Sequence, residues 1–176
     1  MDRNLQKMER ERNQDGFEEK IVQVSRVSKK TKGGNKIGFS VLMVVGNKSG
    51  KVGVGLGKAG DVSQAIKKGV SLAKKHAIEV PIINGSIPFE FYIKLGAAKV
   101  ILKPAPTGSG VIAGGAVRSV VSLAGISNIS SKVLGTGNQA SNVYATIEAL
   151  KRLSERYKRE LKRKEARVSR KAKESK

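Results

Sequence analysis

The residues of this sequence best placed to do chemistry form a run of lysines and glycines at positions 29–36. β-forming residues flank the run on both sides, so it is expected to connect two strands. Lysine neutralises phosphates, and glycine lets a nucleic-acid backbone approach closely. The pattern predicts a finger that contacts RNA, and the alternative is a solvated hairpin tip. The predicted RNA-binding residues of this finger are Lys29, Lys30, Lys32, Gly33, Gly34, Asn35 and Lys36.

A second phosphate candidate lies at positions 104–115, where Thr107, Ser109 and several glycines precede a predicted helix. The free N–H groups at a helix N-terminus bind anions. The anion would be a nucleotide or an RNA phosphate, although the Gly-Lys-Ser/Thr of a Walker loop is absent. A structural loop that leads into a helix explains the same residues, so both interpretations stay open.

Residues 55–60 match the pattern G-x-G-x-x-G, and Glu79 follows at about the distance of the acid in dinucleotide-binding proteins. The strand before this motif belongs, however, to a predicted antiparallel meander and not to a β-α-β unit. No kinase motif follows either. We therefore favour glycines that allow another backbone to pack closely.

Catalytic and metal-binding constellations are missing from the sequence. It has no cysteine and one histidine, His76, which is interpreted as an exposed or satisfied helix residue. Four acids between positions 21 and 150 fall in separate segments, without a paired or metal-binding spacing. The sequence predicts a protein that is not an enzyme and has no cofactor, no metal site and no small-molecule substrate.

The net positive charge of the chain predicts a polyanionic partner. The 176 residues include 35 Lys and Arg against 14 Asp and Glu, a formal charge of +21. Residues 1–20 have a net charge of −1, residues 21–150 carry +13 and residues 151–176 carry +9. Four Phe, three Tyr and no Trp offer few stacking platforms, which favours readout of RNA backbone and shape. Without a membrane-length apolar run or a signal peptide, a cytoplasmic protein is expected.

Hydrophobic periodicity divides the foldable part of the chain into two α+β units. Three strands near residues 21–27, 37–45 and 52–56, the first with a bulge, precede a helix that Asp61 caps and that runs to Ala77. The second unit has strands near 89–93, 100–102 and 129–134, a helix near 113–124 that ends at Gly125, and a helix near 143–157. The predicted division is a mobile arm 1–19, a domain 20–80, a linker 81–88, a domain 89–157 and a basic, disordered tail 158–176.

Three long motifs in fixed order resemble bacterial small-subunit ribosomal protein number five. The first is residues 29–36 with the following FSVLMVVG and GKVGVGLGKA, the second is KPAPTGSGVIAGGAVR, and the third runs from LGTGN to ATIEAL. The resemblance covers roughly residues 18–155.

The resemblance implies an α+β fold. Its N-terminal three-stranded antiparallel sheet with a helix is similar to a double-stranded-RNA-binding domain. A second small α/β sandwich domain with βαβ-type topology follows. Further RNA contacts are implied at Lys51, Lys58, Thr107, Ser109, Arg118 and Asn138.

The implied function is that of a structural constituent of the small ribosomal subunit. Such a protein binds 16S ribosomal RNA and small-subunit proteins four and eight, and lies close to mRNA where the message enters. It supports the head–body arrangement and translational accuracy. Two alternatives are a stand-alone double-stranded-RNA-binding protein and a small phosphotransferase that uses residues 104–115.

Overall fold

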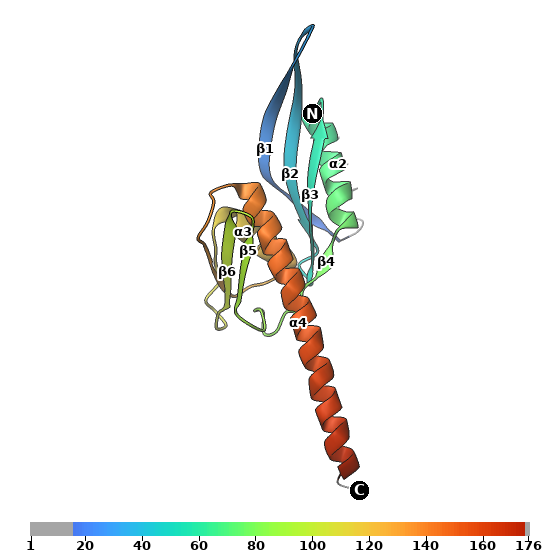
Figure 1. The fold of residues 1–176 in the computed structure, drawn as a ribbon, viewed down its shortest axis with the longest axis vertical. Helices are drawn as coiled ribbons and strands as arrows, with labels where there is room; N and C mark the ends of the chain where they lie inside the picture. Colours follow the sequence, from blue (N-terminus) through green and yellow to red (C-terminus); the bar gives the residue numbers. More distant parts are fainter. Residues whose placement is uncertain (1–15, 175–176) are drawn as a thin grey trace.

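The structure is a computed structural model. It describes the backbone of residues 16–174 and the side chains of residues 16–166. The described residues form two four-stranded sheets and three helices (Figure 1). The elements are β1 (Glu18–Thr31), β2 (Gly34–Gly46), β3 (Lys51–Ala59), α2 (Val62–Lys75), β4 (Ile78–Glu79), β5 (Phe91–Leu95), β6 (Ala98–Pro104), β7 (Val111–Ile112), α3 (Gly115–Ala124), β8 (Ile129–Val133) and α4 (Gln139–Glu174).

The first sheet confirms the predicted antiparallel strands and helix. Its order is β1-β2-β3-β4, and the short β4, which the sequence did not predict, pairs with the start of β3. The register of β1 on β2 shifts between Ile21 and Gln23, which is the predicted bulge. The Asp61 carboxylate accepts a hydrogen bond from Ser63 N at 3.1 Å and so caps α2 as predicted.

The glycines of β3 allow the backbone of helix α2 to pack directly against the backbone of the sheet. A Cβ atom at Gly53, Gly55 or Gly57 would overlap a carbonyl oxygen of α2. Only residues without a side chain allow this approach, and the helix then covers β3 and part of β2. The G-x-G-x-x-G pattern is therefore explained largely by packing.

The β1–β2 hairpin extends beyond the rest of its sheet. The last pair between β2 and β3 is Phe39 with Ala59, whereas β1 and β2 stay paired to Thr31 and Gly34. Figure 1 shows this two-stranded end as the blue tip of the molecule. The predicted finger is thus held by only two strands.

The second sheet has the order β5-β6-β8-β7, and the predicted βαβ unit is β7-α3-β8. β7 and β8 are parallel, while the other neighbours are antiparallel. The two-residue strand β7 was not predicted from the sequence. Gly125 ends α3 with φ +91°, the left-handed conformation expected of a C-terminal glycine.

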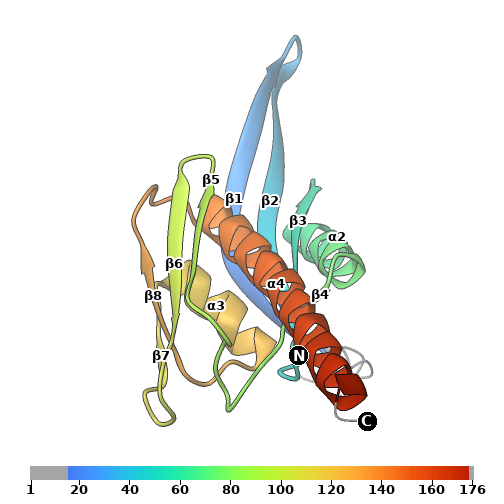
Figure 2. The same ribbon diagram turned by 60° about the horizontal axis from the view of Figure 1, so that its bottom comes forward.

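Helices α3 and α4 lie between the two sheets, while α2 covers the far face of the first sheet (Figure 2). One hydrophobic core therefore spans both halves of the molecule. It includes Leu42 and Val44 of β2, Leu102 of β6, Val120 of α3 and Leu150 of α4, all at most 2% exposed. The two units predicted from the sequence stabilise each other through this core.

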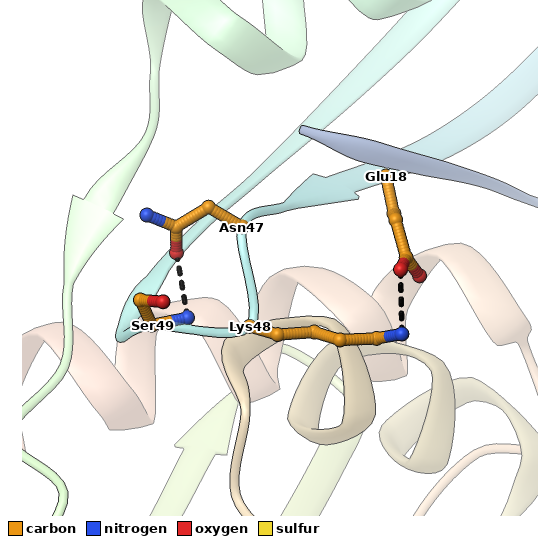
Figure 3. A network of polar contacts seen from close by, with 4 residues as sticks. All are labelled: Glu18, Asn47, Lys48 and Ser49. Carbon is orange, nitrogen blue, oxygen red and sulfur yellow. Dashed lines mark hydrogen bonds and ion pairs between the residues drawn. The ribbon is translucent and has the colours of Figure 1, made fainter. Parts of the chain in front are cut away.

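The turn between β2 and β3 fastens the first sheet to α3. Figure 3 shows the polar side chains of this turn, with Lys48 reaching Glu18 at the start of β1. Asn47 Oδ1 accepts hydrogen bonds from Ser49 N and Lys51 N at 2.9 Å, which shapes the turn. Lys48 N donates to Leu123 O at 3.0 Å, and Lys48 Nζ meets Glu18 Oε1 at 2.5 Å. The turn is thus bonded both to the end of α3 and to the start of β1.

Two segments outside the predicted domains have defined structure in the described residues. In the predicted linker 81–88, Asn84 and Gly85 form a turn with positive φ, and Ile87 is 2% exposed. The predicted disordered tail continues α4 as helix to Glu174. Its Lys, Arg, Glu and Ala residues are good helix formers, and no Gly or Pro interrupts them. The predicted mobile arm lies outside the described residues up to residue 15, and its last residues enter β1.

Candidate nucleic-acid interface

The finger, residues 29–36, is a hairpin tip built around Lys32 and Gly33. Thr31 Oγ1 donates a hydrogen bond to Gly34 O at 2.7 Å, and Gly34 has φ +121°. A side chain at that φ would strain the backbone, so glycine is required for the turn. The predicted finger residues are therefore brought together on one exposed tip.

The lysines of the finger repel one another in the absence of an anion. Lys29 lies directly opposite Lys36 in the register, and Lys30 lies opposite Asn35. Like charges opposite each other destabilise a strand pair. Among the described residues, the four finger lysines make no ion pair. A polyanion that bound here would relieve the repulsion between Lys29 and Lys36.

A shallow groove lies at the base of the finger, where the hairpin leaves β3. Lys29, Lys36 and Lys58 line it together with Val27, Ile37 and Phe39. The groove thus joins Lys58 to the finger, as part of one basic surface. Val27 and Ile37 are 46% and 42% exposed, although their alternation in the sequence is typical of buried strand residues.

The predicted contact Lys51 lies elsewhere. It stands at the opposite end of β3 from Lys58, and its Nζ is 3.5 Å from Glu79 Oε1. Both side chains are more than half exposed, so this ion pair is weak. Lys51 therefore belongs to a different surface from the finger.

The loop of the second phosphate candidate is held by a side chain that sequence reasoning missed. Asn128 Oδ1 accepts hydrogen bonds from Gly108 N at 3.0 Å and Gly110 N at 3.2 Å. Asn128 is 6% exposed and precedes β8. The two N–H groups that would cradle a phosphate are thus already used, although Thr107 and Ser109 remain exposed. β7 also separates this loop from the start of α3.

The last two predicted contacts have structural partners in their own domain. Arg118 Nη2 donates to Val111 O at 3.3 Å. Asn138 Oδ1 accepts from Ala140 N at 3.0 Å and so caps the first turn of α4. The capping role explains Asn138 without RNA, while the exposed Arg118 guanidinium keeps further donors.

Within residues 16–174, other kinds of site are not found. No group of three or more His, Cys, Asp or Glu residues could hold a metal ion there. No helix in the same range is long and apolar enough to cross a membrane. His76 is the exposed C-cap of α2, where the sequence predicted an exposed or satisfied helix residue.

Comparison with known proteins accounts for both halves of the fold. The family description "Ribosomal protein S5, N-terminal domain" matches residues 17–81, and "Ribosomal protein S5, C-terminal domain" matches residues 93–164. The chain belongs to the ribosomal protein S5 family. The two S5 matches leave out residues 82–92, which contain the packed turn at Asn84 and Gly85.

Curated relatives in the S5 family match over most of their length. The chain is 53% identical over 148 residues to "Small ribosomal subunit protein uS5" of Thermotoga neapolitana, which is 84% of this chain and 83% of that protein. It is 54% identical over 137 residues to the proteins of the same name from Thermotoga maritima and Thermotoga petrophila. Those alignments cover 78% of this chain and 77% of each relative.

Proposed function

We propose that this chain is a structural protein of the small ribosomal subunit that binds 16S ribosomal RNA through its finger. The observation that carries the proposal is the exposed hairpin tip, where Lys29 and Lys36 face each other without an anionic partner among the described residues. Because the chain belongs to the S5 family, the ligand that we propose for this tip is ribosomal RNA.

The RNA-binding surface extends from the finger to Lys58 through the basal groove. Lysine heads at the rim neutralise phosphates, and the apolar floor of Val27 and Ile37 excludes water from the sugar–phosphate backbone. Thr107 and Ser109 in the loop after β6, and Arg118 of α3, offer exposed polar groups for a separate contact. Lys51 and Asn138 are the weakest candidates, because each has a partner within the chain.

The role of the protein in the subunit is architectural. Because both sheets share one core, the chain is a stiff body that fixes the distance between the RNA segments it binds. This stiffness supports the expected roles in head–body arrangement and translational accuracy. Small-subunit proteins four and eight, and mRNA where it enters, are the partners that the family resemblance proposes.

Two competing functions receive less support. A phosphotransferase that used residues 104–115 would need the N–H groups that Asn128 occupies. A stand-alone double-stranded-RNA-binding protein would explain the first sheet and α2, but it would leave the second S5 match unexplained.

Sedimentation of a cell lysate tests the proposal. The chain should travel with the small-subunit peak, and its absence from that peak would overturn the ribosomal role. Calorimetry of the isolated chain with millimolar ATP or GTP should show no saturable binding. Saturable binding would favour the phosphotransferase instead.

A further inference from the structure

Helix α4 continues far beyond the core that holds its first half. The last core side chain on it is Leu153, at 0% exposed, and residues 161–166 are all exposed. From Leu153 to Glu174 the helix runs for about 30 Å, at 1.5 Å per residue. Figure 1 shows this part as a rod that leaves the body at the end opposite the finger. Beyond residue 160, packing against the described residues does not explain why the rod is there.

The arginines of α4 lie along one side of this rod. Arg152, Arg156, Arg159 and Arg163 are all exposed, and we call them the arginine stripe. At about 100° per residue they fall within an arc of about 60°. The same spacing continues in the sequence at Arg167 and Arg170.

The lysines of residues 151–166 lie away from this stripe. Lys151, Lys158 and Lys162 occupy an arc of about 40°, roughly a third of a turn from the arginine stripe on one side, and Lys164 lies about a third of a turn away on the other side. A helix that needed charge only for solubility would have no reason to separate the two cations. The separation indicates that guanidinium groups are required on one side.

The body of the protein orients the first half of the arginine stripe. Arg156 lies over the ring of Phe89 at 4.9 Å, and Phe89 contacts Tyr157 with ring centroids 6.2 Å apart. Arg152 Nε is 2.7 Å from Glu148 Oε1. A groove beside the stripe is lined by its arginines, by Phe91 of β5 and by the acids Glu155 and Glu160.

The second half of the arginine stripe is available to a ligand. Among the described residues, Arg159 and Arg163 make no ion pair, and Arg159 Nε donates only to the backbone oxygen of Glu155. The planar guanidinium fork binds a phosphate through two parallel hydrogen bonds, which the lysine ammonium cannot do. A row of such forks along one side of a straight helix suits a phosphodiester backbone.

We propose that the arginine stripe of α4 is a second RNA-binding site, which holds a ribosomal RNA backbone at the end of the molecule opposite the finger. The inference rests on the proposed function, since it assumes that the chain binds ribosomal RNA. The proposal assigns the arginines of the C-terminal segment a ligand, and it places that ligand on one side of the helix.

Two double variants of the full chain test the inference. Arg159→Gln with Arg163→Gln removes two charges from the stripe, while Lys158→Gln with Lys162→Gln removes two charges with the same spacing from the lysine side. The probe is full-length small-subunit ribosomal RNA, and the readout is the slope of log K against log salt. The stripe variant should lower the slope by about 1.5, at 0.7–0.9 per phosphate contact, and the lysine variant by less than about 0.5.

If the two variants lowered the slope equally, or if the lysine variant lowered it more, the arginine-stripe site would be overturned. In that event the groove would be better explained by an acidic protein segment. Circular dichroism at 222 nm checks that both variants keep the helix. A finger variant measured on the same RNA separates the two proposals. It should lower the slope of log K against log salt even if the stripe variant leaves that slope unchanged. If the unmodified chain bound this RNA without salt dependence, both proposals would fail.

Discussion

Both halves of strand β2 pair antiparallel with β1, but their surroundings are opposite. The inner half, residues 41–46, is buried between α2 on one face and α3 on the other. The outer half, residues 34–37, is exposed on the two-stranded finger. Apolar side chains fill the inner half, and lysines flank the outer half. The comparison teaches that one end of the strand stabilises the fold, while the other end leaves the proposed RNA-binding lysines exposed.

The largest effect should come from the inner half. Leu42 is 2% exposed in the core shared by both sheets, so Leu42→Ala should lower the free energy of unfolding by about 3 kcal/mol. Its matched control on the same strand is Ile37→Ala, at 42% exposed, which should cost less than about 1 kcal/mol. Urea unfolding measures both changes, and similar losses for the two variants would break the comparison.

The next effect should come from the strand beside the inner half. A Cβ atom at Gly55 would overlap Gly69 O of α2 and lie 2.7 Å from Ala73 N. Gly55→Ala should therefore cost about 2–3 kcal/mol through displacement of the helix. At Gly60 a Cβ atom meets nothing within 4 Å, so Gly60→Ala should change stability by less than about 0.5 kcal/mol. If Gly55→Ala were neutral, the packing explanation of the glycine motif would be wrong.

A smaller loss is expected at Asn128, outside the first sheet. Asn128→Ala leaves the N–H groups of Gly108 and Gly110 without their acceptor, which should cost about 1–2 kcal/mol. The exposed neighbour Ser109→Ala serves as the control, and thermal unfolding is the measurement. An unchanged melting temperature for Asn128→Ala would show that the loop does not need this side chain.

The smallest effect has the opposite sign and belongs to the outer half. Lys29→Gln removes the like charge opposite Lys36, so the free energy of unfolding should rise by about 0.2–0.5 kcal/mol at low salt. Lys30→Gln, opposite Asn35, should give a smaller change. A loss of stability at Lys29 would mean that the finger lysines help to hold the fold.

The main elements were predictable from the sequence because local patterns specify them. Alternation in β2, the bulge near Val22, the Asp61 cap and the Gly125 end of α3 each depend on neighbouring residues. The shared core was not predictable, because it depends on how Leu42 meets residues far along the chain. The helix of the tail has few side chains to bury, so burial patterns do not predict it, whereas helix propensity continues α4.

The candidate site was predictable in its residue types and less so in its geometry. The run of lysines and glycines at 29–36 marked the finger, since charge and turn chemistry are local. The groove that adds Lys58, Val27 and Ile37 depends on where β3 ends relative to β2. The hydrogen bonds of Asn128 to a loop 18 to 20 residues away have no signature in sequence spacing.

The salt dependence of binding to small-subunit ribosomal RNA tests the central claim most directly. The triple variant Lys29→Gln, Lys30→Gln, Lys32→Gln should lower the slope of log K against log salt by about two. The control removes three exposed charges from α2, with Lys67→Gln, Lys68→Gln and Lys75→Gln, and should lower the slope by less than about one. An unchanged slope for the finger variant, or an equal change in the control, would contradict the assignment of RNA binding to the finger.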